Sequence, residues 1–90
     1  MKPLIVVNFK TYESAQGAAA EELAREMQAT EQATGVAEFV AVVSAFDLES
    51  VWESAPGLAV WTQHLDPVGW GSHTGWLNPD TAIARGARGT

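Results

Sequence analysis

The sequence contains no cysteine, which excludes disulfides and thiolate metal sites. Basic residues are also scarce, with 5 Lys+Arg against 11 Asp+Glu and a formal net charge of −6. Because an acidic surface does not attract polyanions, we expect neither nucleic acid nor an anionic membrane as a partner. The lack of cysteine suits a reducing compartment, so we expect a cytoplasmic location.

Long hydrophobic runs are missing as well. The apolar runs, such as Leu4 to Val7 and residues 39–43, are far too short to span a bilayer. The first ten residues, MKPLIVVNFK, lack the pattern of a signal peptide. What the chain does have is an apolar fraction of 47% with only 18% charged residues over 90 positions, which is typical of one small globular domain.

Three short apolar segments predict β-strands, at residues 3–9, 39–43 and 58–62. The first contains a continuous run of aliphatic residues from Leu4 to Val7. Such a run is typical of a strand buried on both faces, as in a parallel sheet.

A long helix is predicted over about residues 15–34. Ser14 is a candidate N-cap, and Gly35 can take the left-handed conformation that ends a helix. One narrow stripe of this helix is apolar, which suits close packing on a sheet; it comprises Ala20, Leu23, Ala24 and Met27. Glu21 and Arg25 are spaced for a favourable i, i+4 pair.

Two shorter helices are expected further along the chain. Asp47 is a candidate cap for a helix over about residues 48–54. Asn78 and Pro79 have the N-cap and N1 pattern of a third helix, which Gly86 ends.

The alternation of strands and helices predicts an α/β fold with parallel strands and right-handed crossovers. We expect a single domain over residues 1–90, made of three βα units at about 3–35, 36–57 and 58–90.

Ligands of parallel α/β folds bind at the carboxyl ends of the strands. Asn8 and Lys10 follow the first strand, and their spacing of two places them on one side if the strand geometry persists, with Phe9 pointing away. A cation beside a neutral amide suits an anionic or oxygen-rich small ligand. The alternative is that these polar residues only mark the end of a strand.

Several polar residues follow the third strand, including Gln63, His64, Asp66 and His73. The histidine and aspartate spacings match no metal-binding signature, so we expect no metal. Neither histidine is accompanied by an obvious serine or cysteine nucleophile, which disfavours a hydrolytic triad. The segment NFKTYES lacks both the dinucleotide fingerprint and the phosphate loop, so we expect no cofactor.

Two tryptophans, Trp70 and Trp76, flank the sequence GSHTG in a glycine-rich loop. Aromatic residues in such a loop are either folded back onto the domain or buried in a partner. Because tryptophan is enriched in interface cores, we favour the partner interpretation.

Three motifs together resemble the triosephosphate isomerase family, and its shorter archaeal form in particular. They are VNFKTYESA near the start, TGV before the second strand, and QHLDPVGWGSHTGWLNP after the third. The resemblance covers essentially the whole chain. It implies that the three units are the first three of the eight βα units of a TIM barrel, and hence a partial barrel formed by the N-terminal portion of the protein.

The resemblance also implies an activity. The family interconverts dihydroxyacetone phosphate and glyceraldehyde 3-phosphate, in glycolysis and gluconeogenesis, through an enediolate. A glutamate base, a neutral histidine and a lysine carry the reaction. The family's N-x-K motif matches Asn8, Phe9 and Lys10. It implies that Lys10 is catalytic, that all three residues belong to the binding segment for the phosphorylated triose, and that neither a metal nor a cofactor takes part.

A further implication is a homo-oligomer, either a dimer or, as in archaeal forms, a tetramer. Thr74 matches the tip of the loop by which family members reach into a neighbouring subunit. The resemblance therefore places the subunit interface on the loop 64–78, with five residues in it: Trp70, Ser72, His73, Thr74 and Trp76.

The chain also departs from the family pattern. The catalytic histidine of the family lies in an N-H-S-E type motif of the fourth strand, beyond Gly89 and Thr90, and the glutamate base comes later still. Segment 43–46 reads VSAF where an A-P-x sequence is usual, and Trp70 and Trp76 are bulkier than expected. We therefore expect the 90 residues alone to be a truncated, inactive fragment. The alternative is a non-enzymatic partial-barrel module that self-associates or pairs with a complementary chain.

Overall fold

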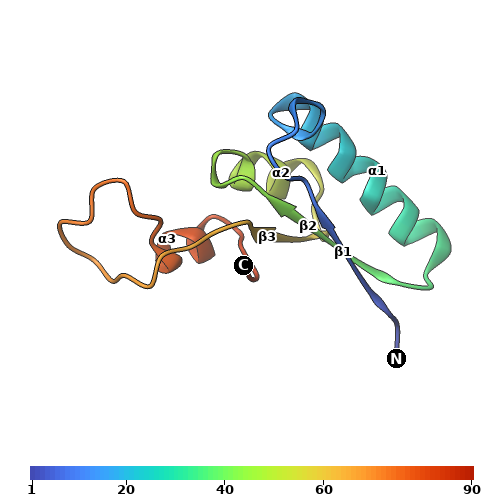
Figure 1. The fold of residues 1–90 in the computed structure, drawn as a ribbon. Helices are drawn as coiled ribbons and strands as arrows, with labels where there is room; N and C mark the ends of the chain where they lie inside the picture. The colour runs from blue at the N-terminus through green and yellow to red at the C-terminus, as the bar shows by residue number, and fades with distance from the viewer.

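The computed structural model describes all 90 residues and contains one sheet of three parallel strands in the order β1-β2-β3. The strands are β1 (Leu4–Asn8), β2 (Glu38–Val43) and β3 (Ala59–Thr62). In the registers, Val6 lies opposite Val40, and Val42 lies opposite Trp61. Each connection runs through a helix, so the predicted α/β fold with parallel βα units is confirmed (Figure 1).

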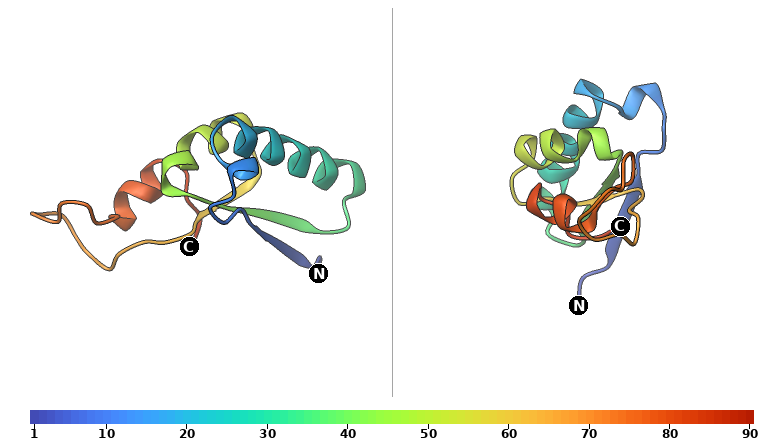
Figure 2. Two further views of the ribbon diagram at one scale, coloured as in Figure 1. Left: turned by 45° about the horizontal axis from the view of Figure 1, so that its top comes forward. Right: turned by 90° about the vertical axis from the view of Figure 1, so that its left-hand side faces the viewer.

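Three α-helices, α1 (Ala18–Thr34), α2 (Leu48–Ser54) and α3 (Pro79–Ala84), follow the strands. Short 3₁₀ helices, η1 (Glu13–Ala15) and η2 (Ala45–Asp47), precede α1 and α2. Figure 2 shows α1 and α2 on the same face of the sheet. None of the helices combines the length and apolar character needed to cross a membrane.

The start of the first helix differs from the prediction. Ser14 lies inside η1 and is not an N-cap, and α1 begins only at Ala18 after Gly17, which has φ 57°. Gly35, by contrast, ends the helix as predicted, with φ 64° and its N–H donating to the carbonyl of Glu31 at 3.0 Å. Local capping signals thus located the end of α1 but not its beginning.

Two further details of the helices also differ. Arg25 pairs with Glu22 at 2.9 Å, so the expected pair with Glu21 is wrong. Glu21 instead accepts a hydrogen bond from Ser54 of α2 at 3.2 Å, which joins the two helices. The third helix begins as predicted, because Asn78 Oδ1 accepts from the N–H of Thr81 at 2.8 Å.

The core lies between the sheet and the helices. The small side chains Ala20 and Ala24 let α1 approach β2 closely, and Met27 extends the same buried stripe. These residues belong to one cluster with Val43 and Val60 of the sheet, Val51 of α2, and Leu58, which directly precedes β3.

The first strand is less buried than predicted. Leu4, Ile5 and Val6 are 51%, 44% and 48% exposed, so the expectation of a strand covered on both faces is wrong for β1 within these 90 residues. β1 pairs only with β2, while α1 packs over β2, and most of β1 therefore lies beyond the helix layer. The prediction holds for β2, where residues 40–43 are all buried.

Residues 88–90 return to the outer edge of β3 after α3. The N–H of Arg88 donates to the carbonyl of Val60 at 2.9 Å, and the N–H of Thr62 donates to the carbonyl of Gly89 at 3.1 Å. Figure 1 shows the C-terminus beside β3. The hydrogen-bonding edge of β3 is therefore partly satisfied within the chain.

Candidate functional site

Asn8 and Lys10 form a tight turn at the carboxyl end of β1. The N–H of Lys10 donates to Asn8 Oδ1 at 2.9 Å, and Lys10 has φ 56°, in the left-handed region that few non-glycine residues adopt. The alternation of side chains between the two faces of the strand therefore ends at Asn8. The two residues are brought together by this turn and not by the continued strand that the spacing suggested.

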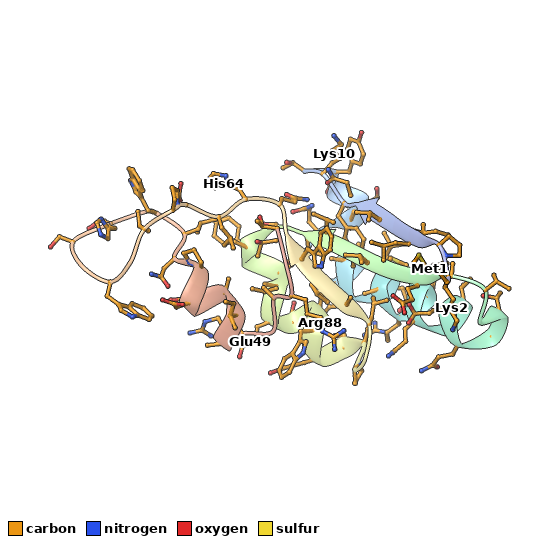
Figure 3. All side chains as sticks on the ribbon, turned by 90° about the horizontal axis from the view of Figure 1, so that it is seen from below. Met1, Lys2, Lys10, Glu49, His64 and Arg88 are labelled. Carbon is orange, nitrogen blue, oxygen red and sulfur yellow. The ribbon has the colours of Figure 1, made fainter.

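The turn leaves polar groups of both residues available to a ligand. Asn8 Oδ1 accepts the hydrogen bond from the Lys10 N–H, and this bond orients the Asn8 side-chain amide. Asn8 Nδ2 therefore remains as a hydrogen-bond donor. Lys10 is exposed and belongs to none of the three ion pairs in the chain. Figure 3 shows Lys10 beyond the end of β1, on the side of the molecule where His64 begins the long loop.

Phe9 lies between these two residues but has a different environment. Its side chain is only 2% exposed and belongs to the core cluster, in agreement with the expectation that it points away from Asn8 and Lys10. Its N–H continues the ladder by donating to Val42 at 2.9 Å. Phe9 therefore anchors the turn, and only its main chain remains for contact with a ligand.

Two glutamines contact the same turn from other elements. Gln63, directly after β3, donates from Nε2 to the carbonyl of Lys10 at 2.8 Å, and Gln16, directly after η1, donates to the same oxygen at 3.0 Å. Gln63 was predicted to follow a strand but was given no role, and Gln16 was not among the predicted site residues. A signal for Gln63 was present in its position at the carboxyl edge, but nothing local marked Gln16.

The Lys10 turn is an open edge and not a closed pocket, because neither Asn8 nor Lys10 lines any cavity of the chain. A groove nearby is lined by Ser44, Phe46, Gln63 and His64, among others. Phe46 is 99% exposed, a feature that its place after a strand did not reveal.

His64 and Asp66, which were considered as metal ligands, close the base of the long loop. Asp66 exchanges main-chain and side-chain bonds with Leu77: its N–H donates to the Leu77 carbonyl at 2.9 Å, and its Oδ2 accepts from the Leu77 N–H at 2.7 Å. His64 Nε2 lies 2.9 Å from Asp66 Oδ1. The Leu77 N–H, and secondarily His64, lower the pKa of Asp66 below its ordinary value of 3.8.

The Asp66–Leu77 hydrogen bonds form the neck of the long loop. Beyond this neck the loop extends away from the body of the chain (Figure 1). Trp70 is 73% exposed and Trp76 is 58% exposed, so neither is folded back into the core. The rings of His73 and Trp76 lie 6.3 Å apart, and Ser72 and Thr74 are exposed. His73 does not join His64 and Asp66 in a cluster that could hold a metal ion. All five residues predicted for an interface lie on one projecting segment.

Comparison with known proteins agrees with the arrangement of strands and motifs. Residues 3–90 match the family model described as triosephosphate isomerase. A triosephosphate isomerase of Methanococcoides burtonii is 40% identical over the whole chain and 40% of its own length. Those of Archaeoglobus fulgidus and Methanothermus fervidus are 38% and 37% identical over 97% and 99% of the chain, and 38% and 39% of their own lengths.

The chain therefore spans about two fifths of the length of the curated relatives that it matches. The family match extends from residue 3 to residue 90, a range that includes the turn at Lys10 and the loop with its two tryptophans. The chain belongs to the triosephosphate isomerase family.

Proposed function

We propose that this chain supplies the lysine-bearing part of a triose phosphate isomerase site, in which Lys10 binds the phosphorylated triose and Asn8 donates a hydrogen bond to it. The observation that carries the proposal is the turn itself, which holds an unpaired ammonium and an amide donor together at the carboxyl edge of the sheet. A fixed cation at this edge stabilises the negative charge that develops on the substrate oxygen during enediolate formation.

Lys10 acts in this proposal by electrostatics and not by proton transfer. The proton transfer of the family needs a glutamate base and a histidine that the resemblance matches to no residue of this chain. His64 is paired with Asp66, and His73 lies on the projecting loop. We therefore propose that the 90 residues alone do not turn over triose phosphate.

An exchange of segments tests the role of Lys10. Residues 1–90 would replace the matching two fifths of the Methanothermus fervidus relative, and isomerase activity of the chimera would be measured. Lys10→Ala should lower kcat/KM by about 100-fold or more, as expected for loss of one charge-stabilising donor. Lys2→Ala, a change to an exposed lysine before the other end of β1, is the matched control. A folded chimera in which both variants keep full activity would refute the proposal.

We further propose that the chain associates with a second copy through the loop 64–78. The support is the exposure of Trp70, Trp76 and Phe46, with Trp76 and Phe46 lining one groove. Exposed aromatic side chains of this kind are enriched in interface cores. A homo-oligomer accounts for them.

The alternative function, a non-enzymatic partial barrel that associates with itself or with a complementary chain, is favoured by a different observation: the apolar residues left uncovered on β1. Sedimentation of Trp70→Ser and Val6→Ser variants separates the two surfaces. If the loop carries the association, Trp70→Ser yields the smaller species and Val6→Ser does not. The reverse result would favour the exposed strand and the alternative.

A further inference from the structure

The main-chain carbonyl of Lys10 is the meeting point of three elements. It accepts one hydrogen bond from Gln63 Nε2 at 2.8 Å and a second from Gln16 Nε2 at 3.0 Å. A carbonyl oxygen has two lone pairs, so both amides can bind it at once. The end of β1 is thereby connected by side chains to the end of β3 and to the segment before α1.

Lys10 needs such support because its backbone is in an unfavourable region. Its φ of 56° is the one positive value at a non-glycine residue of the chain. A lysine in this region persists only where the surroundings hold it there. Two hydrogen bonds to its carbonyl fix the peptide plane that follows the turn, and with it the direction in which the side chain leaves the backbone.

Both glutamines are themselves anchored by main-chain hydrogen bonds. The N–H of Gln63 donates to the carbonyl of Val43 at 2.9 Å, which continues the ladder between β2 and β3. The carbonyl of Gln16 accepts from Ala19 at 3.1 Å, in the first turn of α1. The two side-chain amides therefore fix the Lys10 carbonyl relative to the sheet and to α1.

The surroundings of the Gln63 side chain require a hydrogen-bond donor. Besides the carbonyl of Lys10, its Nε2 faces the Val42 carbonyl at 3.4 Å and Asn8 Oδ1 at 3.5 Å. All three neighbours are acceptors. An amide satisfies them, whereas a carboxylate of the same size would place further oxygen lone pairs against them.

We infer that Gln16 and Gln63 are positioning residues that together hold Lys10 in its left-handed conformation and so aim its ammonium at the ligand. The inference rests on the proposed function in that Lys10 is taken to bind the phosphorylated substrate. Because the two amides share one acceptor, either one retains part of the effect when the other is lost.

The test uses the isotope-labelled 90-residue chain and four variants: Gln16→Ala, Gln63→Ala, the double variant and Gln63→Glu. Gln32→Ala is the matched control, since Gln32 is exposed on α1 and makes no hydrogen bond through its side chain. The first readout is the NMR signature of a positive φ at Lys10, namely its Cα and Cβ shifts and a strong HN–Hα cross-peak within the residue. The second is a titration with inorganic phosphate, followed at the Lys10 side chain.

Each alanine variant should weaken phosphate binding by about fivefold, the effect of one ordinary hydrogen bond. The double variant should lose the left-handed signature and weaken binding by more than the product of the single effects, as expected for two groups acting on one atom. Gln63→Glu should behave like Gln63→Ala, because the donor and not the size of the side chain is what matters.

A double variant that keeps both the left-handed signature and phosphate affinity within twofold would overturn the inference, as would a Gln63→Glu variant identical to the unmodified chain. The proposed function fails separately. If Lys10→Ala leaves phosphate affinity unchanged, Lys10 does not bind the anion, while the backbone signature still decides whether the glutamines hold the turn.

Discussion

Asp47 and Gly17, thirty residues apart in sequence, are joined by a hydrogen bond in which Asp47 Oδ2 accepts from the Gly17 N–H at 3.1 Å. Gly17 is the N-cap position of α1, and no side chain within the first turn caps this helix. Asp47 was expected to cap α2, yet its carboxylate makes no such bond there. It lies at the N-terminus of α1 instead, where the helix dipole favours a negative charge.

This relationship predicts the effect of removing the carboxylate. Asp47→Ala leaves the N-terminus of α1 without its acceptor and should lower the free energy of unfolding by about 1 to 2 kcal/mol. The measurement is urea denaturation at fixed chain concentration. Glu53→Ala, at an exposed α2 residue without a hydrogen-bond partner, is the control and should change stability by less than about 0.5 kcal/mol. Equal losses in the two variants would show that the Asp47–Gly17 contact contributes nothing.

The neck of the long loop should open in acid. Because the folded-state pKa of Asp66 is lowered, its contribution is fully present above the ordinary value of 3.8 and is lost as the pH falls through the lower folded-state pKa. The Leu77 amide proton shift should therefore stay constant from pH 7 to 5 and move only below about 3.8, the ordinary aspartate value.

An amide without a neighbouring carboxylate serves as the control. The Phe9 N–H donates to the Val42 carbonyl at 2.9 Å, and no Asp or Glu lies within two residues of either, so its shift should remain unchanged over this range. Asp66→Asn should abolish the acid step at Leu77. A Leu77 step that persists in that variant, or that is centred above pH 3.8, would contradict the assignment to Asp66.

Local sequence signals were sufficient for the order of elements and for several of their ends. The aliphatic runs, the glycine at position 35 and the Asn78-Pro79 pair act over a few residues, and the structure agrees with each of them. They predict a parallel α/β fold because repeated βα units have few other ways to bury such strands.

Contacts distant in sequence could not be read in this way. The start of α1 depends on Asp47, which no pattern near Gly17 reveals. The candidate site shows the same limit: the residues at the end of β1 were predicted, but not the hydrogen bond that the Lys10 carbonyl accepts from Gln63, 53 residues away in sequence. The exposure of β1 likewise follows from where α1 lies and not from the strand's own composition.

Gly86 should tolerate no side chain. Its φ is 108°, and an added Cβ would overlap Cγ of Trp52. Gly86→Ala therefore combines backbone strain with a steric clash, and should lower the free energy of unfolding by about 3 kcal/mol. Thermal and urea unfolding measure the loss.

Gly69→Ala is the matched control for Gly86, since its φ is not positive and no atom lies within 4 Å of the added Cβ. It should leave stability unchanged within about 0.5 kcal/mol. Adding Trp52→Ala to Gly86→Ala should relieve the clash but not the strain, and so recover only part of the loss. Full recovery would assign the whole effect to the clash.

The side chain of Thr62 is expected to oppose folding. It is fully buried on β3, and its Oγ1 has no hydrogen-bond partner within the chain, so its hydroxyl loses water without gaining a bond. Thr62→Val keeps the shape and should raise the free energy of unfolding by about 1 kcal/mol. Thr81→Val removes the hydrogen bond from Thr81 Oγ1 to Asn78 Oδ1 at 3.2 Å and should lower the free energy of unfolding. A destabilising Thr62→Val in urea denaturation would mean that the hydroxyl is satisfied by bound water.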